Sequence, residues 1–241
     1  MKATVLILTV EEATIGDVIG AVYENCELSL LEEVLVVYSR RSSAEYVRFL
    51  ETLDARFPGL RVRVCCQPGS GTGDALYYGF SEARGSHVIT AASDAETDPA
   101  DIGAMLSMAA RYPDRIVTAS RRLAKGGLRQ YPLWKKLFGY LFQTFLKILF
   151  RSRQTDITFP FQCTPMEVFR GYAFSPDHSA FVLELALQPE LSGVPFTEIP
   201  SSLGKRKDGV SHTTLRYYFG FLKAALALYR RNKKQKKSRR P

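Results

Sequence analysis

Short apolar runs alternate with segments of helical periodicity through the first 120 residues of the chain. The run at residues 4–10 is continuously apolar, which is typical of a strand covered on both faces. Further strands are predicted at residues 33–38, 61–66, 86–92 and 116–119. The intervening segments predict helices at residues 15–24, 43–57, 74–83 and 100–112. Because strands that alternate with helices are joined by right-handed crossovers, we expect an α/β fold with a mostly parallel central sheet.

The second half of the chain has a more helical pattern. It predicts helices at residues 131–151, 180–188 and 214–229, a strand at residues 196–199, and a loop or strand at residues 156–164. No segment rich in Pro, Gly or Ser divides the chain, which favours one domain over two. We expect this domain to span residues 1–212, followed by a helix at residues 213–229 and a tail at residues 230–241.

Two of the predicted helices have one-sided apolar patterns. Residues 214–229 carry a single apolar stripe, and residues 131–151 carry a broad apolar face with lysines at its margins. Both patterns are typical of helices that lie in the plane of a membrane interface, although helices that pack into a protein core are the alternative. No uncharged apolar run is long enough to predict a transmembrane helix.

Charge is concentrated in the tail. The chain has a formal net charge of +9, and eight of its basic residues lie in the last twelve positions, so the remainder is close to neutral. A near-neutral body argues against a nucleic-acid-binding protein, whereas a basic tail favours attraction to an anionic membrane. A solubilising tail and a nucleic-acid-binding tail are the alternatives. The four cysteines lack the spacing of a zinc site and predict a reduced, cytosolic protein.

The most informative polar motif is the pair of carboxylates Asp94 and Glu96, directly after the strand predicted at residues 86–92. Ligands of open α/β sheets bind at the carboxyl ends of the strands. Two carboxylates at this edge can hold Mg²⁺ or Mn²⁺, which would also bridge the phosphates of a ligand. The alternative is a pair of solvated loop residues. Asp98, which precedes Pro99 and a helix, is better explained as a helix N-cap.

Two further segments are candidates for binding phosphate. The glycine-rich turn at residues 69–73 precedes a predicted helix, whose backbone amides could approach an anion, but a plain tight turn explains it better. The basic run at residues 205–207 contains Arg206, whose guanidinium can grip a phosphate with two hydrogen bonds. A solvated surface loop is the alternative for this run.

The order of these motifs resembles that of the family 2 glycosyltransferases over about residues 4–230. The matching segments are Glu12, the glycine turn, Asp94-Ala95-Glu96, Ala119-Ser120-Arg121, Lys125-Gly126-Gly127, Asp156, Phe181–Leu185, Glu198-Ile199-Pro200, Arg206 and Gly209-Val210-Ser211. Within the family, the chain resembles the polyprenyl-phosphate sugar synthases of the dolichyl-phosphate mannose type. The resemblance implies a nucleotide-diphospho-sugar-binding domain of the glycosyltransferase A type.

The resemblance also implies roles for individual residues. Asp94 and Glu96 would bind the divalent metal and the donor diphosphate. Glu12 would lie near the nucleotide. The remaining candidates are Arg121 and Arg206 for the donor, and Arg121 and Lys135 for the acceptor. Asp94, Glu96 and Arg206 are thereby the candidate catalytic residues, together with Asp156, which would act as a base if the acceptor were a hydroxyl group.

The implied activity is inverting transfer of a sugar from a nucleotide-diphospho-sugar to a polyprenyl or dolichyl phosphate. A phosphate oxygen is already anionic at neutral pH, so this acceptor requires no strong base. We expect a cytoplasmic protein, peripheral on the inner face of a membrane. The chain departs from the family pattern at residues 39–41, where Ser-Arg-Arg replaces an acidic pair, and at residues 159–163. A non-catalytic protein of the same fold that docks on a membrane or a partner is therefore the alternative.

Overall fold

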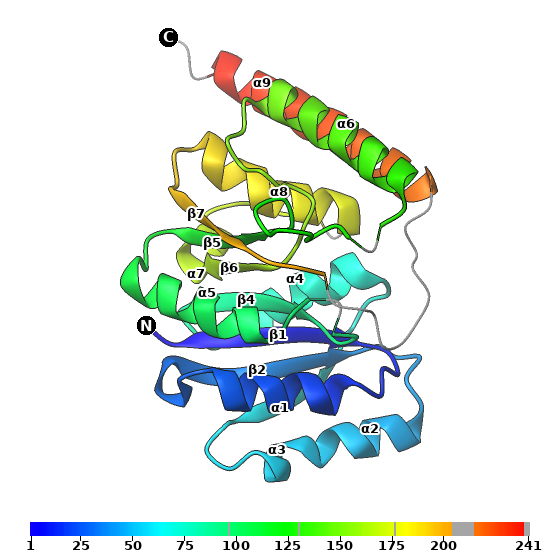
Figure 1. The fold of residues 1–241 in the computed structure, drawn as a ribbon, viewed down its shortest axis with the longest axis vertical. Coiled ribbons are helices and arrows are strands. Elements are labelled where there is room, and N and C mark those ends of the chain that lie inside the picture. The colour runs from blue at the N-terminus through cyan, green and yellow to red at the C-terminus, as the bar shows by residue number, and fades with distance from the viewer. Residues whose placement is uncertain (96, 130, 176, 204–214, 239–241) are drawn as a thin grey trace.

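The computed structural model describes residues 1–95, 97–129, 131–175, 177–203 and 215–238. Its central sheet has seven strands in the order β3-β2-β1-β4-β6-β5-β7 (Figure 1). The strands are β1 (Ala3–Thr9), β2 (Leu31–Tyr38), β3 (Val62–Cys66), β4 (His87–Ala92), β5 (Ile116–Ser120), β6 (Gln162–Pro165) and β7 (Phe196–Pro200). Only β6 is antiparallel to its neighbours, so the expectation of a mostly parallel sheet is confirmed.

The helices connect these strands and extend the fold beyond the sheet. They are α1 (Ile15–Asn25), α2 (Ala44–Glu51), α3 (Leu53–Arg56), α4 (Thr72–Glu82), α5 (Ala100–Arg111), α6 (Leu133–Phe150), α7 (Met166–Arg170), α8 (His178–Leu191) and α9 (Leu215–Ser238). A short 3₁₀ turn, Leu28–Leu30, precedes β2. Within the described residues, no helix combines the length and the apolar character needed to cross a membrane.

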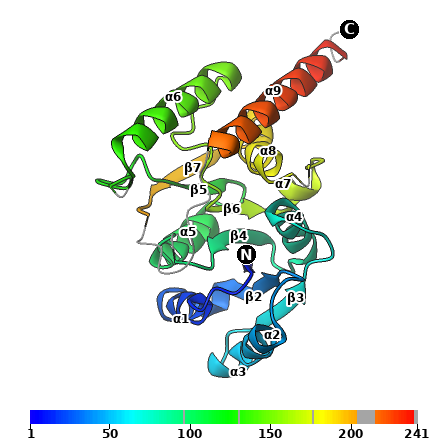
Figure 2. The ribbon, with the colours of Figure 1, turned by 90° about the vertical axis from the view of Figure 1, so that its right-hand side faces the viewer.

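Each face of the sheet is buried by its own helices. The side chains of β1 alternate between two cores: Val5 and Ile7 pack in one, and Leu6 packs in the other. The first core contains the apolar faces of α1 and α5, and the second contains those of α4 and α8. Figure 2 shows these helix pairs on opposite sides of the sheet. The continuous apolar runs of the sequence follow from this double coverage.

The topology brings six strand ends to one edge of the sheet. Because β6 alone is antiparallel, the carboxyl ends of the other strands point the same way. The segment that follows β4, and the segment that follows β5, therefore emerge at the same edge. Strand β6 separates the two in the sheet order. Helices α6 and α9 lie together at the end of the molecule beyond β7 (Figures 1 and 2).

Two helical segments differ from the prediction. The helix predicted at residues 43–57 is divided at Thr52, whose hydroxyl donates a hydrogen bond to the carbonyl of Phe49 at 2.7 Å. Such local bonds compete with the helical pattern. Helix α9 does not end at Tyr229 but continues to Ser238. This extension consists of Arg, Lys, Gln, Asn and Ser without glycine or proline, and Lys, Arg and Gln are good helix formers.

Candidate functional site

A cleft of about 1000 Å³ lies at the carboxyl ends of β1, β2 and β3. Its walls are formed by residues that follow these strands, together with the first turn of α4 and Asp94. The polar and charged side chains that line it are Thr9, Glu12, Ser39, Arg40, Arg41, Gln67, Ser70, Thr72, Asp74 and Asp94. The cleft is large enough for a nucleotide-sized ligand.

Asp94 lies where β4 leaves the sheet, at the junction of two hollows. It lines the large cleft and also a second hollow of about 230 Å³, which extends toward Phe161 and His178. The next residue, Ala95, has a φ of 56°. A positive φ is uncommon outside glycine and marks a sharp, strained turn of a kind that is concentrated at functional sites. Glu96, the second predicted metal ligand, lies outside the described residues.

Glu12 closes the end of β1. Its Oε2 atom accepts hydrogen bonds from the Thr9 hydroxyl and the Val10 backbone amide, both at 2.7 Å. The hydroxyl of Tyr46, on α2, donates to the backbone carbonyl of Glu12 at 2.9 Å. These bonds fix the turn after β1 and hold a carboxylate at the wall of the cleft.

The glycine turn forms the N-terminus of α4. Gly71 occupies the N-cap position with a φ of 95°, a conformation that favours glycine. The carboxylate of Asp74, in the first turn of α4, accepts a hydrogen bond from the Ser70 backbone amide at 3.2 Å. A carboxylate of the chain itself therefore binds a backbone amide next to the N-terminus of this helix. A β-carbon on Gly69 would lie 2.7 Å from an Asp74 oxygen, so glycine is required for this close approach. The turn therefore shapes the wall of the cleft and carries its own negative charge.

The residues after β5 form a second, basic group. Two hollows of about 80 Å³ and 620 Å³ share Arg121, Arg122 and Lys136 in their walls. The other cationic residues that line them are Lys125, Arg129 and Lys135. Asp156 is the only acid among the described residues that line either hollow. This concentration of positive charge suits an anionic ligand.

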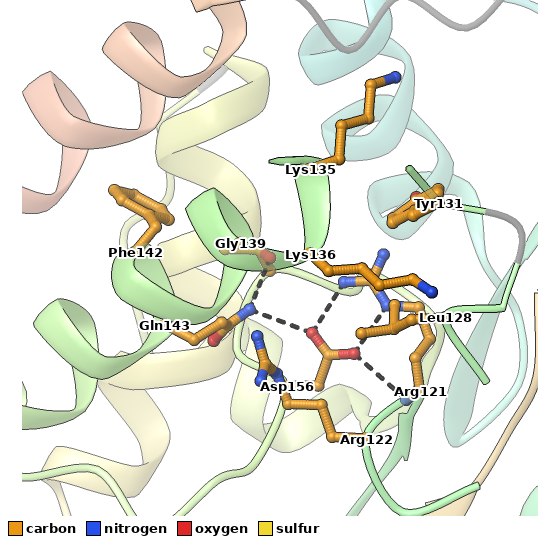
Figure 3. Close-up of a pocket in the computed structure, with 11 residues that line it drawn as sticks. Arg121, Arg122, Leu128, Tyr131, Lys135, Lys136, Gly139, Phe142, Gln143 and Asp156 are labelled. Carbon is orange, nitrogen blue, oxygen red and sulfur yellow. Dashed lines mark hydrogen bonds and ion pairs between the residues drawn. The ribbon is translucent and has the colours of Figure 1, made fainter. Parts of the chain in front are cut away.

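Arg121 and Asp156 form a buried ion pair at the floor of these hollows (Figure 3). The Nε and Nη2 atoms of Arg121 donate to the two carboxylate oxygens at 2.7 and 2.8 Å, and its backbone amide donates at 3.2 Å. The carboxylate is 2% exposed. Asp156 is therefore fully engaged in orienting Arg121, an arrangement that fits a positioning role better than the role of a general base predicted for it.

A third residue completes this group. Gln143, from α6, donates from Nε2 to Asp156 at 3.1 Å and to the Thr158 hydroxyl at 2.8 Å, and its Oε1 accepts from the Ile157 amide at 3.0 Å. The ring of Phe159 lies 4.5 Å from the guanidinium carbon of Arg121. The segment 156–159 thus connects α6 to the end of β5.

The remaining cations differ in their surroundings. Burial lowers the pKa of the Arg122 guanidinium, and the charge of Arg121 adds to this effect, although Asp156 opposes it. A bound anion would favour the charged form of the Arg122 guanidinium and so oppose this lowering of its pKa. Figure 3 shows Lys136 extending past Leu128, on the side of Arg121, whereas Lys135 points away from Asp156. The Lys135 ammonium instead lies 5.6 Å from the Trp134 ring centroid.

Of the predicted site residues, Glu12 and Asp94 line the donor-sized cleft, and Arg121, Lys135 and Asp156 line the basic hollow. Arg206, like Glu96, lies outside the described residues. The structure adds residues that the sequence patterns had not singled out, namely Arg122, Lys136, Gln143 and His178. The sequence contains one indication that Gln143 has polar partners, because it is the only amide side chain within the largely apolar sequence of α6.

The donor atoms at the end of β4 fit a hard divalent cation. Among the described residues, no group of three or more His, Cys, Asp or Glu side chains is placed to enclose a metal ion. Asp94 nevertheless supplies carboxylate oxygens at the wall of an open cleft. Such a residue can hold Mg²⁺ or Mn²⁺ when the diphosphate of a ligand and water provide the other oxygens.

Residues 4–175 match the family model for glycosyl transferase family 2. The structure is similar to that of glucosyl-3-phosphoglycerate synthase from Mycobacterium tuberculosis in complex with Mn²⁺, uridine diphosphate and phosphoglyceric acid, with a TM-score of 0.69, 15% identity, and coverage of 95% of this chain and 78% of that chain. The complex of that enzyme with Mn²⁺, UDP-glucose and phosphoglyceric acid also has a TM-score of 0.69 and 15% identity, with coverage of 95% of this chain and 79% of that chain. The structure is also similar to that of TarS 1–349 of S. aureus, with a TM-score of 0.60, 14% identity, and coverage of 83% of this chain and 58% of that chain. At these identities, the likeness shows a shared fold.

Proposed function

The chain belongs to glycosyl transferase family 2, and on that premise we propose that it transfers a sugar from a nucleotide-diphospho-sugar to a polyprenyl phosphate at a membrane surface. One observation carries the choice of acceptor. A basic hollow adjoins a helix, α6, that exposes a row of large apolar side chains. A ligand with an anionic head and a long apolar tail matches both features.

The donor would occupy the cleft at the ends of β1, β2 and β3. The M. tuberculosis enzyme, which shares the fold, has been solved with Mn²⁺ and UDP-glucose, and this supports a metal-dependent nucleotide-sugar donor. Asp94 and Glu96 would hold the metal, and Glu12 would lie near the nucleotide. When bound, the metal would offset the negative charge that develops on the departing diphosphate. Arg206 remains a predicted contact of this diphosphate.

The acceptor phosphate would bind among Arg121, Arg122 and Lys136. In the transfer, a phosphate oxygen attacks the anomeric carbon, the bond from that carbon to the donor diphosphate breaks, and the nucleoside diphosphate leaves. Direct attack inverts the anomeric centre. Because the attacking oxygen is already anionic, the task of the protein is to orient the reactants rather than to remove a proton. Asp156 would contribute by orienting Arg121. Lys135, which lines the same hollow, would add positive charge near the acceptor phosphate.

The membrane contact would be made by α6 and α9. The exposed apolar side chains are Leu133, Trp134, Leu137, Phe138, Tyr140, Leu141 and Ile148 on α6, and Phe219, Leu226 and Tyr229 on α9. An exposed apolar surface of this kind marks a site of interaction with a membrane or a partner. Arg231 pairs with the buried Glu184 at 2.9 Å. The other basic residues from Arg230 onward would add about 1 kcal/mol each near anionic lipid, before screening by salt. Together they favour a peripheral position on an anionic membrane.

A screen of nucleotide sugars by thermal shift, with and without Mn²⁺, tests the donor side. Ligands that bind the native state raise its melting temperature. We expect one class of nucleotide-diphospho-sugar to raise the melting temperature of the protein, and to do so only when Mn²⁺ is present. If no nucleotide sugar stabilises the protein under either condition, the chain is the non-catalytic docking protein that is the alternative.

A further inference from the structure

Helix α6 has one buried polar side chain. The residues on its buried face are Gln143, Leu146 and Phe150, and Gln143 is 4% exposed. Leu146 and Phe150 join the second apolar core, where an amide would be costly unless its hydrogen bonds were made elsewhere. The position of Gln143 in the helix is therefore explained by its polar partners and not by packing.

Both ends of the Gln143 amide are used. Its oxygen accepts from the Ile157 backbone amide, so the NH₂ group is directed to Asp156 and Thr158. The two oxygens of Asp156 in turn hold Arg121 (Figure 3). A continuous series of hydrogen bonds thereby runs from the middle of α6 to the guanidinium at the end of β5.

This series connects the two features that the proposed acceptor needs. The exposed apolar row of α6 lies on the same helix as Gln143, from about one to about three turns away, and Arg121 lies in the basic hollow. Apart from Gln143, the buried contacts of α6 are apolar, and its main partner among the described helices is α9. Apolar contacts are non-directional, whereas the three hydrogen bonds of the Gln143 amide add a directional restraint between α6 and residues 156–158.

We propose that Gln143 is a positioning residue that fixes the register of α6 relative to Arg121, so that a lipid lying along α6 presents its phosphate to the guanidinium. This inference rests on the proposed function, because it takes a lipid phosphate to be the acceptor. Gln143 acts through Asp156, and Arg121 is the residue that contacts the phosphate. The substrate requirement that follows is an apolar chain linked directly to a phosphate.

The test measures the affinity for farnesyl monophosphate by calorimetry in wild type, Gln143→Leu and a matched control, Thr144→Val. Thr144 is adjacent on α6, and its hydroxyl bonds only within the helix, to the Tyr140 carbonyl at 2.9 Å. We expect Gln143→Leu to weaken binding about 10-fold, the effect of losing a hydrogen bond to a charged group. Thr144→Val should bind as wild type does. The affinity for nucleoside diphosphate with Mn²⁺ should stay unchanged in both variants.

A second variant separates positioning from packing through its pH profile. In Gln143→Glu, a protonated carboxyl keeps one donor for Asp156 and one acceptor for the Ile157 amide, whereas an ionised carboxylate repels Asp156. The charged groups that line the hollow with this position are Arg121, Arg122, Lys135, Lys136 and Asp156. Burial beside the Asp156 carboxylate would raise the pKa of the introduced carboxyl above its ordinary value of about 4.3, although the neighbouring cations oppose this. We therefore expect the ratio of variant to wild-type affinity to be highest at the lowest pH at which both proteins are folded and to fall by about 10-fold near pH 8.

The outcomes are distinct. If wild type does not bind farnesyl monophosphate, the proposed acceptor is wrong and the inference falls with it. If wild type binds but Gln143→Leu binds equally well, or Gln143→Glu shows a flat ratio, the positioning role alone is wrong. Should Gln143→Leu fail to fold, Thr158→Val removes one of its bonds and is expected to weaken binding about 3-fold. Unchanged binding by that variant would also contradict the role.

Discussion

The cleft at the ends of β1, β2 and β3 and the hollow after β5 share one edge of the sheet but differ in charge. Among the described residues, the cleft contains three carboxylates, from Glu12, Asp74 and Asp94, and two guanidinium groups, from Arg40 and Arg41, whereas the hollows after β5 contain six cations and a single carboxylate. A diphosphate can bind beside carboxylates when a metal ion lies between them, and arginines can contact it directly. The hollows, with their excess of cations, suit an anion without a metal. Under the proposed function, the difference predicts a metal-dependent donor in the cleft and an acceptor phosphate that needs no metal in the hollows.

The carboxylates themselves differ in the same way. Asp94 lines two open hollows, where a ligand can reach it. Asp156 is buried, and both its oxygens are bound to Arg121. Under the proposed function, an aspartate would bind a ligand on one side and would orient a ligand-binding side chain on the other. Four predictions, ordered from the largest expected effect to the smallest, test this contrast and the structure around it.

Removing Asp156 should have the largest effect on stability. Asp156→Ala leaves the guanidinium of Arg121 buried without its partner, which typically costs about 3–5 kcal/mol of unfolding free energy. The matched control is Glu33→Ala, because Glu33 is buried against Arg63 at 2.8 Å near the start of β2, at the opposite edge of the sheet. In urea unfolding, both variants should lose stability.

Ligand binding then distinguishes the two ion pairs. The folded fraction of Glu33→Ala should bind farnesyl monophosphate as wild type does, whereas that of Asp156→Ala should not. An Asp156→Ala protein with wild-type stability would show that the ion pair is not the buried, coupled pair described above. Equal binding by both variants would remove Asp156 from the acceptor site.

Removing Asp94 should affect binding and spare the fold. Since Asp94 lies in a strand-end turn at an open cleft, we expect the unfolding free energy of Asp94→Ala to change by less than about 0.5 kcal/mol. Binding of a nucleoside diphosphate in the presence of Mn²⁺ should weaken at least about 10-fold, as expected for loss of a metal ligand. The control is Asp98→Ala, since Asp98 is exposed and its carboxylate accepts a hydrogen bond from the nearby Ala100 amide. Equal effects of the two substitutions would refute the metal assignment.

Deleting residues 230–241 should weaken membrane binding without abolishing it. The basic residues attract anionic lipid over a range that salt shortens to about 8–10 Å at physiological strength. The apolar side chains of α6 and α9 contribute burial that salt does not screen. Wild-type binding to anionic vesicles should therefore fall to a plateau as salt is added, and the truncated protein should begin near that plateau. Trp134, the only tryptophan, lies on the exposed face of α6 and reports docking by its fluorescence.

The absence of a plateau would contradict this account of the membrane contact. If binding disappears at high salt and the emission of Trp134 does not shift on vesicles, α6 takes no part in docking. The choice of a lipid-linked acceptor would then lose its main support.

The smallest effect is expected from a histidine that belongs to neither region. His87, at the start of β4, is buried, and burial lowers its pKa. Its neutral ring bonds to the Ser86 hydroxyl and the Pro113 carbonyl. Because the folded pKa lies below the unfolded value of about 6.5, its contribution to stability is complete above that pH and declines as the pH falls. Urea midpoints of His87→Gln should depend less on pH over this range than those of wild type, and an identical dependence would contradict the assignment.

The inner strands β1 and β2 could be predicted from the sequence because they are covered on both faces and consist largely of apolar residues, whereas the edge strands β3 and β7 are only partly buried. The sequence predicts β6 only as a loop or strand. This strand is short, and its backbone hydrogen bonds are made with β4 and β5, which are distant in sequence. The extension of α9 beyond Tyr229 differs from the predicted helix because the apolar stripe ends there, whereas Lys and Arg continue to favour helical backbone.

The site could be predicted in part. Asp94 and Glu12 follow strands directly, so topology places them at the edge where ligands bind. The pairing of Arg121 with Asp156 joins residues 35 positions apart, and neither local pattern contains any sign of the other. Gln143 was visible only as a polar interruption of an apolar helix, and its partners lie in a loop whose course no periodicity predicts. Tertiary contacts of this kind require the structure.

Transfer of sugar into a lipid product tests the central claim most directly. The protein is incubated with Mn²⁺, the radiolabelled nucleotide sugar that stabilises it best, and anionic vesicles containing polyprenyl monophosphate. Label in the organic phase, sensitive to mild acid and absent with Asp94→Ala, is the result that this account predicts. Label that stays in the aqueous phase as free sugar, or that passes instead to phosphoglyceric acid as a soluble acceptor, would contradict a lipid phosphate acceptor.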